Sequence, residues 1–545
     1  MSATTATTAD APTLLPGLRS VLARAGSRWT APTVMAGAAL IAVVVAAVAV
    51  AHRTGFGGAV PALILAIVLV ILAVGGFVLC VRRSDQRVPS WYVILFADVA
   101  FATVTLLAVG SSGPSVVGLL VGLVVLSAPL LVGRLTRMPT SLGVLDVFAA
   151  VAVLVIFQLP RVGESTFNLS TPTDFFQLPA VTVAAAPTTI VVALLLGVLA
   201  VLAHLPMLRT ARDRLPLWVA TVFALLFLFA FLTWAAAGLR DIPVPGLLLG
   251  SLALATPLIF GSLGGVLGER AGVVNVAIDG QLLFGAFSAA LVGSATHSAI
   301  IGLIAAIVAG VLVAWVLAVF ALRYWVDQVI VGVVLNVLVT GLTNFFYTKI
   351  IAPNPSLNQT TKFPTLPIPG LSEIPVIGPV LFKHTIIVYI MFIAVFAVWY
   401  ALYKTRWGLR VRSVGEHPQA ADTVGINVNR TRFWTVSIAG AIAGIGGAYY
   451  TLDALSSFGK EMTNGAGFIA LAAVIFGRWH PIRAALAGLL FGFATNLQST
   501  FATIGSPVPS EFLLTLPYII TIVAVAGLVG QSRAPAADGT PYIKS

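Results

Sequence analysis

The sequence predicts an all-α fold, a polytopic transmembrane bundle of about sixteen crossings, and three observations lead to it. Of the 545 residues, 59% are hydrophobic and 9% are charged, which is more apolar surface than one soluble core can bury. Several apolar runs reach the roughly 18 to 20 residues that a helix needs to cross a bilayer. Short basic clusters separate these runs, as cytoplasmic loops do in membrane proteins.

Runs such as Val34–Ala51, Ala59–Val81 and Trp91–Val109 are apolar on all sides, so they predict helices and not the alternating strands of a membrane barrel. The alternation of basic and cation-poor loops predicts a multi-pass protein of a bacterial inner membrane with both termini in the cytoplasm. No removable signal peptide is expected. The crossing at Gly465–Gly477 is too short for a straight span and is expected to be a half-helix among its neighbours.

The net charge of +12 does not indicate nucleic acid, because the cations lie in short clusters between apolar runs and form no continuous basic face. Membrane lipids are the expected surroundings. Cys80 is the one cysteine, which excludes an internal disulfide and a multi-cysteine metal site. His204, His417 and His480 stand singly at membrane boundaries, so no metal site is expected and polar anchoring is favoured over enzymatic catalysis.

Four domains are predicted. A cytoplasmic arm, 1–33, precedes an additional transmembrane block, 34–240, with about seven spans of mostly Ala, Val, Leu and Gly. Two prolines in Asp241–Gly246 would interrupt any continuous helix and mark the boundary. A core, 241–530, of about nine helices follows, and a cytoplasmic tail, 531–545, ends the chain.

The first informative segment of the core is Leu267–Gln281, which runs into an apolar helix. Charged groups at membrane depth cost roughly 2.5 to 3.5 kcal/mol each, so Glu269, Arg270 and Asp279 should lie at an interface or face the protein interior. Asn275 and Gln281 can bond backbone groups freed at a helix break. A purely structural turn would use the same residue types, and that interpretation stays open.

The second informative segment is the basic loop Lys404–Arg432. Pro418 can begin a short helix there, and the run Glu416–Asp422 is predicted to form about two helical turns. Ala420 and Ala421 are small enough to let this helix fit closely into a groove of a soluble partner. The loop is therefore a candidate docking element.

At these residues the chain resembles the permease family of ATP-binding cassette importers that includes ribose and branched-chain amino acid permeases, and most of all the nucleoside-importer permeases. Four stretches carry the resemblance, in the family's order and spacing: Gly268–Asn275 with Asp279–Gln281, Thr405–Asn427, Phe468–Pro481, and Leu516–Tyr518. Asp279 departs from the pattern, since the family usually has Glu there. The residues ahead of the core have no counterpart in compact members.

The resemblance implies an importer permease with a separate cassette ATPase. No G-x-x-x-x-G-K-[ST] phosphate loop occurs in the sequence, so this chain is not expected to be an enzyme or to bind a cofactor, and ATP would be used by the partner. A second permease subunit, identical or different, and a lipid-anchored substrate-binding protein are further implied partners. The coupling helix that contacts the ATPase would be formed by Gly415, Glu416, His417, Pro418, Gln419, Ala420, Ala421, Asp422 and Thr423.

A nucleoside cargo offers a stackable base and several hydroxyls, so aromatic and amide groups within the core helices are candidates for the substrate pathway. These are Phe284, Phe287, Asn336, Asn344, Phe345 and Asn496. Helix packing by Phe and helix bridging by Asn remain an alternative for each. The Pro-rich segment Ile351–Lys383 is expected to lie outside and to meet the binding protein, or else to be a disordered surface loop.

Two other classes remain open. In an ion-coupled secondary transporter, Asp98 and Asp146 would carry protons or sodium, but no paired broken helices mark two equivalent halves. A simple sugar or branched-chain amino acid could replace the nucleoside on the same scaffold. With few polar groups besides Asp98 and Asp146, the block 34–240 is expected to lie peripherally and to be dispensable for transport.

Overall fold

The computed structural model describes residues 156, 161–172, 174–203, 217–239, 241–505 and 533–543. Most of the predicted N-terminal spans, Cys80, Asp98, Asp146, His204 and the terminal Leu516–Tyr518 motif lie outside these residues. The chain divides into two compact units. Unit 1 comprises Met1–Ser165, Val183–Leu239 and Ala526–Gly530, and unit 2 comprises Thr166–Thr182, Arg240–Val525 and Gln531–Ser545.

Unit 1 contributes two described apolar helices, α7 (Ala185–Ala203) and α8 (Leu217–Ala236), which pack against each other. The strand β1 (Glu164–Asn168) begins in this unit, and the Ser165 hydroxyl donates a 2.8 Å hydrogen bond to the Thr233 carbonyl. The strand β2 (Val181–Ala184) follows it. These apolar helices need neighbours or lipid around them, because neither carries a charged residue.

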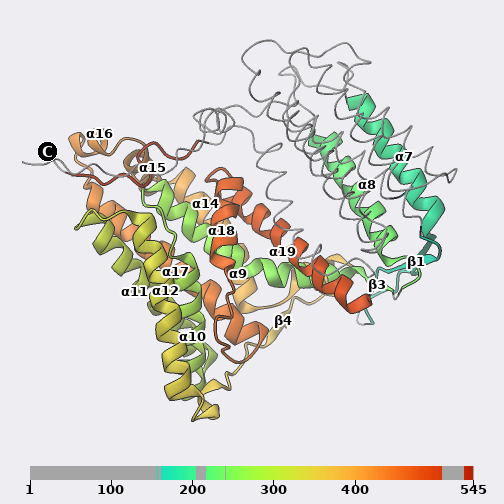
Figure 1. Ribbon diagram of the computed structural model, residues 1–545, viewed down its shortest axis with the longest axis horizontal. Helices are drawn as coiled ribbons and strands as arrows, with labels where there is room; N and C mark the ends of the chain where they lie inside the picture. The colour runs from blue at the N-terminus through green and yellow to red at the C-terminus, as the bar shows by residue number, and fades with distance from the viewer. Residues whose placement is uncertain are drawn as a thin grey trace, which may run out of the picture. The chain divides into compact units, whose positions relative to one another are not determined.

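Unit 2 is a helical bundle (Figure 1). Its longer helices are α9 (Val244–Arg270), α10 (Ile278–Thr296), α11 (Ala299–Leu322), α12 (Gln328–Phe346), α14 (Ile386–Lys404), α15 (Arg406–Glu416), α17 (Val428–Tyr449), α18 (Ala466–Phe476) and α19 (Pro481–Ile504). Short elements are β3 (Ile242–Pro243), η2 (Tyr347–Ile351), η3 (Pro355–Asn358), β4 (Thr365–Pro367), α13 (Ile377–Phe382), β5 (Lys383–Thr385), α16 (Pro418–Thr423) and η4 (Tyr450–Ala454).

Small residues let the central helices approach closely. α9, α10 and α17 pack against one another, and α11 packs against α10 and α17. A Cβ added to Gly310 of α11 would overlap the carbonyl oxygen of Gly440 in α17, and a Cβ added to Gly444 would overlap that of Ala306. Helix backbones in direct contact gain dispersion energy that lipid cannot replace, and this explains why glycine is frequent in the core.

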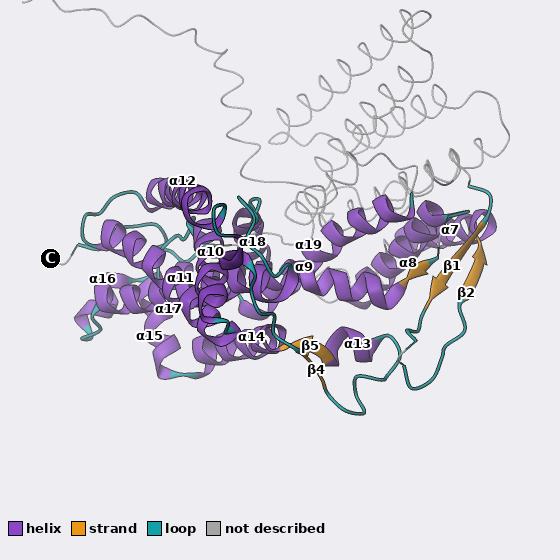
Figure 2. Ribbon diagram, turned by 90° about the horizontal axis from the view of Figure 1, so that it is seen from below, coloured by secondary structure: helices purple, strands orange, loops and turns teal. Residues whose placement is uncertain are grey.

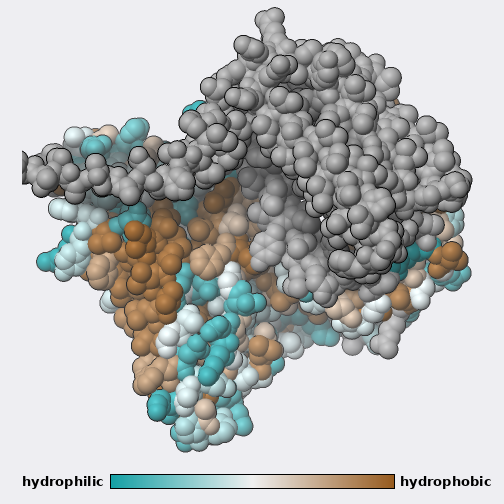
Figure 3. Space-filling view, in the orientation of Figure 1, coloured by the Kyte–Doolittle hydropathy of each residue, from teal (hydrophilic) through white to brown (hydrophobic). Residues whose placement is uncertain are grey.

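The outer helix faces are apolar and exposed, as expected for lipid contact. Val337 of α12 is 68% exposed and Ile393 of α14 is 66% exposed. Figure 3 shows hydrophobic residues gathered over α11 and α12. Within the described residues, seven helices are long and apolar enough to cross a membrane, and α18, with 11 residues, is too short. The expected half-helix at 465–477 is therefore confirmed as a short helix.

The described chain is mostly helical, as predicted, but it also contains five short strands that the all-α prediction did not include. β1 pairs in parallel with β3, with Phe167 opposite Ile242, and β4 pairs antiparallel with β5. Strands of two to five residues carry too little alternation to be recognised in a sequence. They lie in connections between helices.

The Pro-rich segment 351–383 is folded and not a disordered loop. It contains η3, β4 and α13, and Figure 2 shows β4 and α13 beside β5. The Asn358 amide donates to the Phe458 carbonyl and accepts from the Phe458 N–H, at 3.0 and 2.7 Å. The Thr360 N–H donates to the Ser456 carbonyl at 3.0 Å, and the Phe363 N–H to the Leu452 carbonyl. These hydrogen bonds fasten the segment to residues 452–458, which follow α17.

Candidate functional site

Backbone geometry builds the turn from α14 into α15. The Thr405 hydroxyl accepts a hydrogen bond from the Gly408 N–H at 3.1 Å and caps the first turn of α15. A Cβ on Gly408 would overlap the Ala401 and Leu402 carbonyls, so only glycine permits this turn. At the other end of α15, a Cβ on Gly415 would overlap the Arg270 carbonyl. α15 is therefore held directly against the end of α9.

The predicted two-turn helix at 416–422 is instead divided at His417. His417 has an extended backbone and lies between α15, which ends at Glu416, and α16, which begins at Pro418. The proline ring disfavours helical geometry in the residue before it, and Pro418 itself is well placed at the first helical position. The nine residues Gly415–Thr423 thus form the end of one helix and one short helix.

Only part of α16 is free to meet a partner. His417, Gln419, Ala420 and Thr423 are exposed. Ala421 is 3% exposed and packs in an apolar cluster with Val414, Val428 and Tyr542. The expectation that Ala420 and Ala421 both present a small outer surface is therefore wrong for Ala421, because this side of α16 faces the protein.

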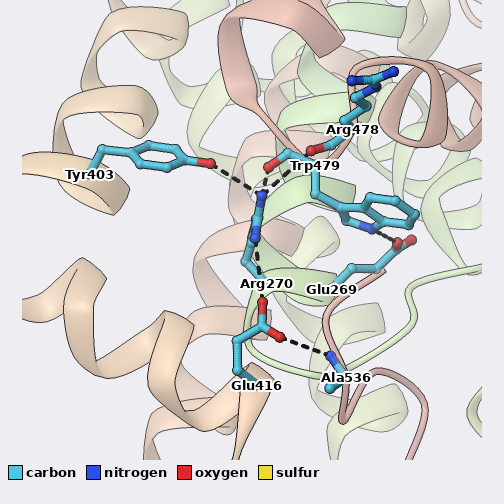
Figure 4. A network of polar contacts seen from close by, with 7 residues as sticks. All are labelled: Glu269, Arg270, Tyr403, Glu416, Arg478, Trp479 and Ala536. Carbon is cyan, nitrogen blue, oxygen red and sulfur yellow. Dashed lines mark hydrogen bonds and ion pairs between the residues drawn. The ribbon is translucent and has the colours of Figure 1, made fainter. Parts of the chain in front are cut away.

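A polar network lies beneath α15, where α9 ends (Figure 4). Arg270 donates to the Trp479 carbonyl at 2.9 Å, to the Tyr403 hydroxyl at 3.2 Å and to the Arg478 carbonyl at 3.5 Å. Its guanidinium also lies 3.8 Å from the Glu416 carboxylate. One arginine thus connects α9, α14, α15 and the turn between α18 and α19.

Glu269 and the neighbouring turn complete this network. Glu269 is 2% exposed and accepts a short hydrogen bond from the Trp479 indole. Arg478 and Trp479 both adopt the left-handed backbone region, with φ of 55° and 54°, which costs energy in a residue with a side chain. Burial, then the charges of Arg483 and Arg270, lower the pKa of His480, so its ring is neutral near pH 7. Three segments that the sequence analysis singled out therefore meet here: 267–281, 404–432 and 468–481. We name this site the basic end.

The second half of the first motif stabilises local structure. The Asn275 amide donates to Gln281 at 3.0 Å. The Asp279 carboxylate accepts a 2.9 Å hydrogen bond from the Gly467 N–H, in the first turn of α18. Backbone N–H groups at a helix start lack partners within the helix, and a carboxylate there also complements the helix dipole. Asp279 thus fixes the half-helix α18 to α10.

The candidate pathway residues separate into three groups. Asn336 donates to the Val276 carbonyl at 2.9 Å and accepts from the Gly280 N–H at 2.8 Å, and Asn496 donates to the Leu247 carbonyl at 2.7 Å. Both bridge helices. Phe345 is 56% exposed on the outer face of α12. Its ring contacts Phe346 at 5.5 Å, whereas Asn336 and Asn496 serve as helix bridges.

Phe284 and Phe287 lie in one aromatic cluster, which we name the aromatic end. Their rings stack at 6.5 Å, and Phe287 also contacts Phe346 at 6.1 Å and Phe458 at 5.3 Å. Asn344, on the last turn of α12, donates to Glu461 at 3.0 Å, while its carbonyl oxygen is buried without a hydrogen-bond partner in the described part of the chain. α12 starts beside the basic end, where Gln328 accepts from the Val274 N–H, so its last turn lies at the opposite end of the bundle.

Sequence reasoning missed Phe346, Phe458 and Glu461 at the aromatic end. Phe346 directly follows Phe345 in the sequence. The one signal that could have distinguished them is that neighbouring residues of a helix lie on different faces, so only one of the two would face outward. Phe458 and Glu461 lie in an irregular segment after η4, where no periodicity guides a prediction. No group of three or more His, Cys, Asp or Glu side chains able to hold a metal occurs among the described residues.

Comparisons with known proteins identify the family of the chain. The family described as "Branched-chain amino acid transport system / permease component" matches residues 247–525. The chain is 41% identical over 305 residues to the guanosine ABC transporter permease protein NupQ of Bacillus subtilis, covering 54% of this chain and 95% of the relative. It is 40% identical over 305 residues to the nucleoside ABC transporter permease protein NupC of Lactococcus lactis, with the same coverage.

A more distant relative is the glucose ABC transporter permease protein TsgB13 of Haloferax volcanii, 28% identical over 259 residues, 44% of this chain and 66% of the relative. No solved structure matches the chain. The matched residues contain the whole polar network of the basic end except the contact from Ala536. The chain therefore belongs to the permease family of branched-chain amino acid type ABC transport systems.

Proposed function

We propose that the chain is the membrane-spanning permease of an ATP-driven importer whose cargo is a nucleoside. The observation that carries this proposal is the identity of about 40% to two permeases named for guanosine and nucleosides, over 95% of their length. The aromatic end supports it, because stacking between a base and an aromatic ring contributes about 1 to 3 kcal/mol with little preference among bases. Several nucleosides should therefore be accepted.

The base is proposed to stack on Phe284, the partly buried ring of the aromatic end, and to meet Asn344 with its polar edge. The buried, unpartnered carbonyl oxygen of Asn344 can accept a hydrogen bond from an amino group of a base, and such a group is costly to leave unpaired. Glu461 beside it offers further acceptor oxygens. Asn336 is a weaker candidate for binding the base, because its side-chain amide already forms hydrogen bonds with the Val276 carbonyl and the Gly280 N–H.

Energy is proposed to enter at the basic end. Six cations of the loop, Lys404, Arg406, Arg410, Arg412, Arg430 and Arg432, favour a cytoplasmic position, with both termini on the same side of a bacterial inner membrane. The exposed face of α16 around Ala420 is then proposed to contact a cassette ATPase. That partner, and not this chain, would hydrolyse ATP. A movement of α16 would reach α9 through Gly415 and Arg270.

Two further partners are proposed: a second permease subunit and a lipid-anchored binding protein that meets the segment 351–383. The prolines of this segment and its contacts to Phe458 and Leu452 reduce the entropy lost on binding. Replacing residues 364–376 by a Gly/Ser linker of equal length should raise the cargo concentration needed for uptake. Unchanged uptake would remove the segment from the interface.

The block 34–240 is proposed to be dispensable for transport. Because Thr166–Thr182 belongs to unit 2 and Phe167 pairs with Ile242, the informative deletion is 1–155 and not the whole block. The shortened chain should assemble with its partners and import cargo. A well-inserted, assembled protein without any uptake would show that the block is part of the transport machinery.

The test of the proposed function is uptake of labelled guanosine by cells or vesicles that contain this chain with its neighbouring transport proteins. Uptake should require ATP, and unlabelled nucleosides should compete with the label. Glucose, ribose and leucine, added separately, should not. Transport of one of these three without competition by any nucleoside would reassign the cargo, and uptake that follows an ion gradient without ATP would reassign the class.

A further inference from the structure

The segment Arg533–Ile543 lies along the end of α15, in the position that Figure 1 shows near α15 and α16. The Ala537 N–H donates a 2.9 Å hydrogen bond to the Gly415 carbonyl, and the Ala536 N–H donates to the Glu416 carboxylate at 3.1 Å. Both acceptors belong to the end of α15, just before the break at His417. The segment, which we name the tail strap, thus fastens this end of the helix.

The tail strap also contacts α17 through a buried arginine. Arg432 is 0% exposed, and it donates to the Thr540 carbonyl at 2.9 Å and to the Ala537 carbonyl at 3.5 Å. A buried guanidinium is costly unless it is hydrogen-bonded and near a negative charge. The tail strap supplies these acceptors and also the Asp538 carboxylate, whose pKa the charge of Arg432 lowers against the larger effect of burial.

The third contact reaches the turn after α9. Gly272 has a φ of +86°, and a Cβ there would lie 2.7 Å from the Arg432 guanidinium and 3.0 Å from the Ala537 carbonyl oxygen. Gly539 lies against Val274, since a Cβ on it would meet that side chain at 3.4 Å. The turn Ala271–Val274, Arg432 and the tail strap therefore pack as one piece.

Tyr542 covers the inner side of α16. It is 7% exposed and packs with Val414, Ala421 and Val428. Its hydroxyl forms a hydrogen bond with Asp422 of α16. α16 has six residues and is too short to hold its own orientation, so the packing of the Tyr542 ring on Ala421 fixes which of its residues face outward.

We propose that the tail strap is a positioning element of energy transmission, joining α16 to α9 and α17 through Ala537, Arg432 and Tyr542. The inference rests on the proposed function, in which movement enters at α16. Without the strap, α16 would lose the contacts of Tyr542 and keep its chain connections and its packing against Val414 and Val428. A push on α16 would then be absorbed by reorientation of the short helix and would not move α9 and α17.

The test compares Tyr542→Ala with Ile543→Ala, a neighbouring variant whose side chain is 61% exposed, and with Tyr542→Phe, which keeps the ring. Purified complexes with the ATPase are reconstituted, and nucleoside uptake and ATP hydrolysis are measured together. Tyr542→Ala should lower uptake per ATP hydrolysed about tenfold, within the range that coupling between two sites usually spans. The other two variants should stay within about twofold of the wild type.

Hydrogen exchange of the backbone amides separates positioning from general stability. In Tyr542→Ala, exchange should accelerate in 415–428 and stay unchanged in α9 and α11. Unchanged uptake per ATP, unchanged exchange in 415–428, or equally accelerated exchange throughout the bundle would each overturn the proposal. If the wild-type complex imports no nucleoside, the proposed function fails, whereas the exchange of 415–428 still decides whether the strap orients α16.

Discussion

The basic end and the aromatic end of unit 2 are built differently. At the basic end, one arginine joins four elements through hydrogen bonds of 2.9 to 3.5 Å, and glycines allow backbones to touch. At the aromatic end, rings contact one another at 5.3 to 6.5 Å, and Asn344 on the last turn of α12 has an unpartnered side-chain oxygen. Hydrogen bonds between rigid elements transmit displacement, whereas ring surfaces can accept flat ligands of several shapes. This difference fits the proposal that energy enters at the basic end and that cargo is recognised at the aromatic end.

The largest difference in stability is expected between two glycine-to-alanine substitutions, one at the basic end and one near the aromatic end. Gly415→Ala would drive a Cβ into the Arg270 carbonyl, and backbone atoms cannot turn aside. We expect a loss of about 1 to 3 kcal/mol of stability or more, seen as a lower thermal unfolding temperature of the purified protein. Gly341→Ala is the matched control on α12, where a Cβ meets nothing within 4 Å. Equal unfolding temperatures for the two variants would contradict the close contact at the basic end.

Substitutions of two asparagines of α12 distinguish a residue that stabilises the fold from a residue that is proposed to bind the cargo. Asn336→Ala leaves the Gly280 N–H and the Val276 carbonyl unpaired, so it should cost about 1 to 3 kcal/mol of stability without changing which nucleosides compete. Asn344→Ala should leave the unfolding temperature nearly unchanged and weaken guanosine competition. The measurements are thermal unfolding and competitive uptake. The reverse pattern would place cargo recognition at Asn336.

A change of one ring tests the aromatic end directly. Phe284→Leu keeps an apolar side chain but removes the ring proposed to stack on the base, so the apparent affinity for all transported nucleosides should fall by about 1 kcal/mol, or roughly fivefold. Binding of the ATPase should not change. Concentration series of guanosine and of a pyrimidine nucleoside, together with co-purification of the ATPase, measure both quantities. A loss confined to one base would show that stacking is not the shared contact.

The smallest expected effect is a pH dependence at the tail strap. Burial is the main cause that raises the pKa of Asp538 to about 7. Because the docked pKa lies above the ordinary value, docking is favoured at low pH and weakens as the pH rises through about 7. A hydrogen bond from the Gly539 backbone and the charge of Arg432 oppose this shift of the Asp538 pKa, and Glu269 also interacts with Asp538. Exchange of 415–428, corrected for intrinsic rates, should be faster at pH 8 than at pH 6, and Asp538→Asn should remove the difference.

Much of the basic end could be predicted from the sequence, because charged residues and glycines are rare in apolar helices and therefore stand out. Glu269, Arg270 and Gly415 were recognisable in this way. Their meeting with Trp479 could not be predicted, since it joins residues far apart in the chain. The tail strap was also missed: Ala537 and Thr540 act through backbone atoms, which no side-chain pattern reveals.

The aromatic end was less predictable for a different reason. Phe is frequent in every membrane helix, so Phe287 and Phe345 look equivalent in the sequence, although one is 4% and the other 56% exposed. Which helix face meets the protein interior depends on neighbouring helices, and α12 has few charged residues to mark its outer side. Asn336 and Asn344 likewise differ only in their partners.

Ala420→Arg tests whether ATP-driven movement enters through the exposed face of α16. Ala420 is exposed while Ala421 is buried, so this single change alters the outer surface without disturbing the apolar cluster around Tyr542. The complex should lose ATPase co-purification and ATP-dependent guanosine uptake, with an unchanged unfolding temperature of the permease. Normal ATPase binding together with normal uptake in this variant would show that α16 only anchors the topology and that energy enters elsewhere.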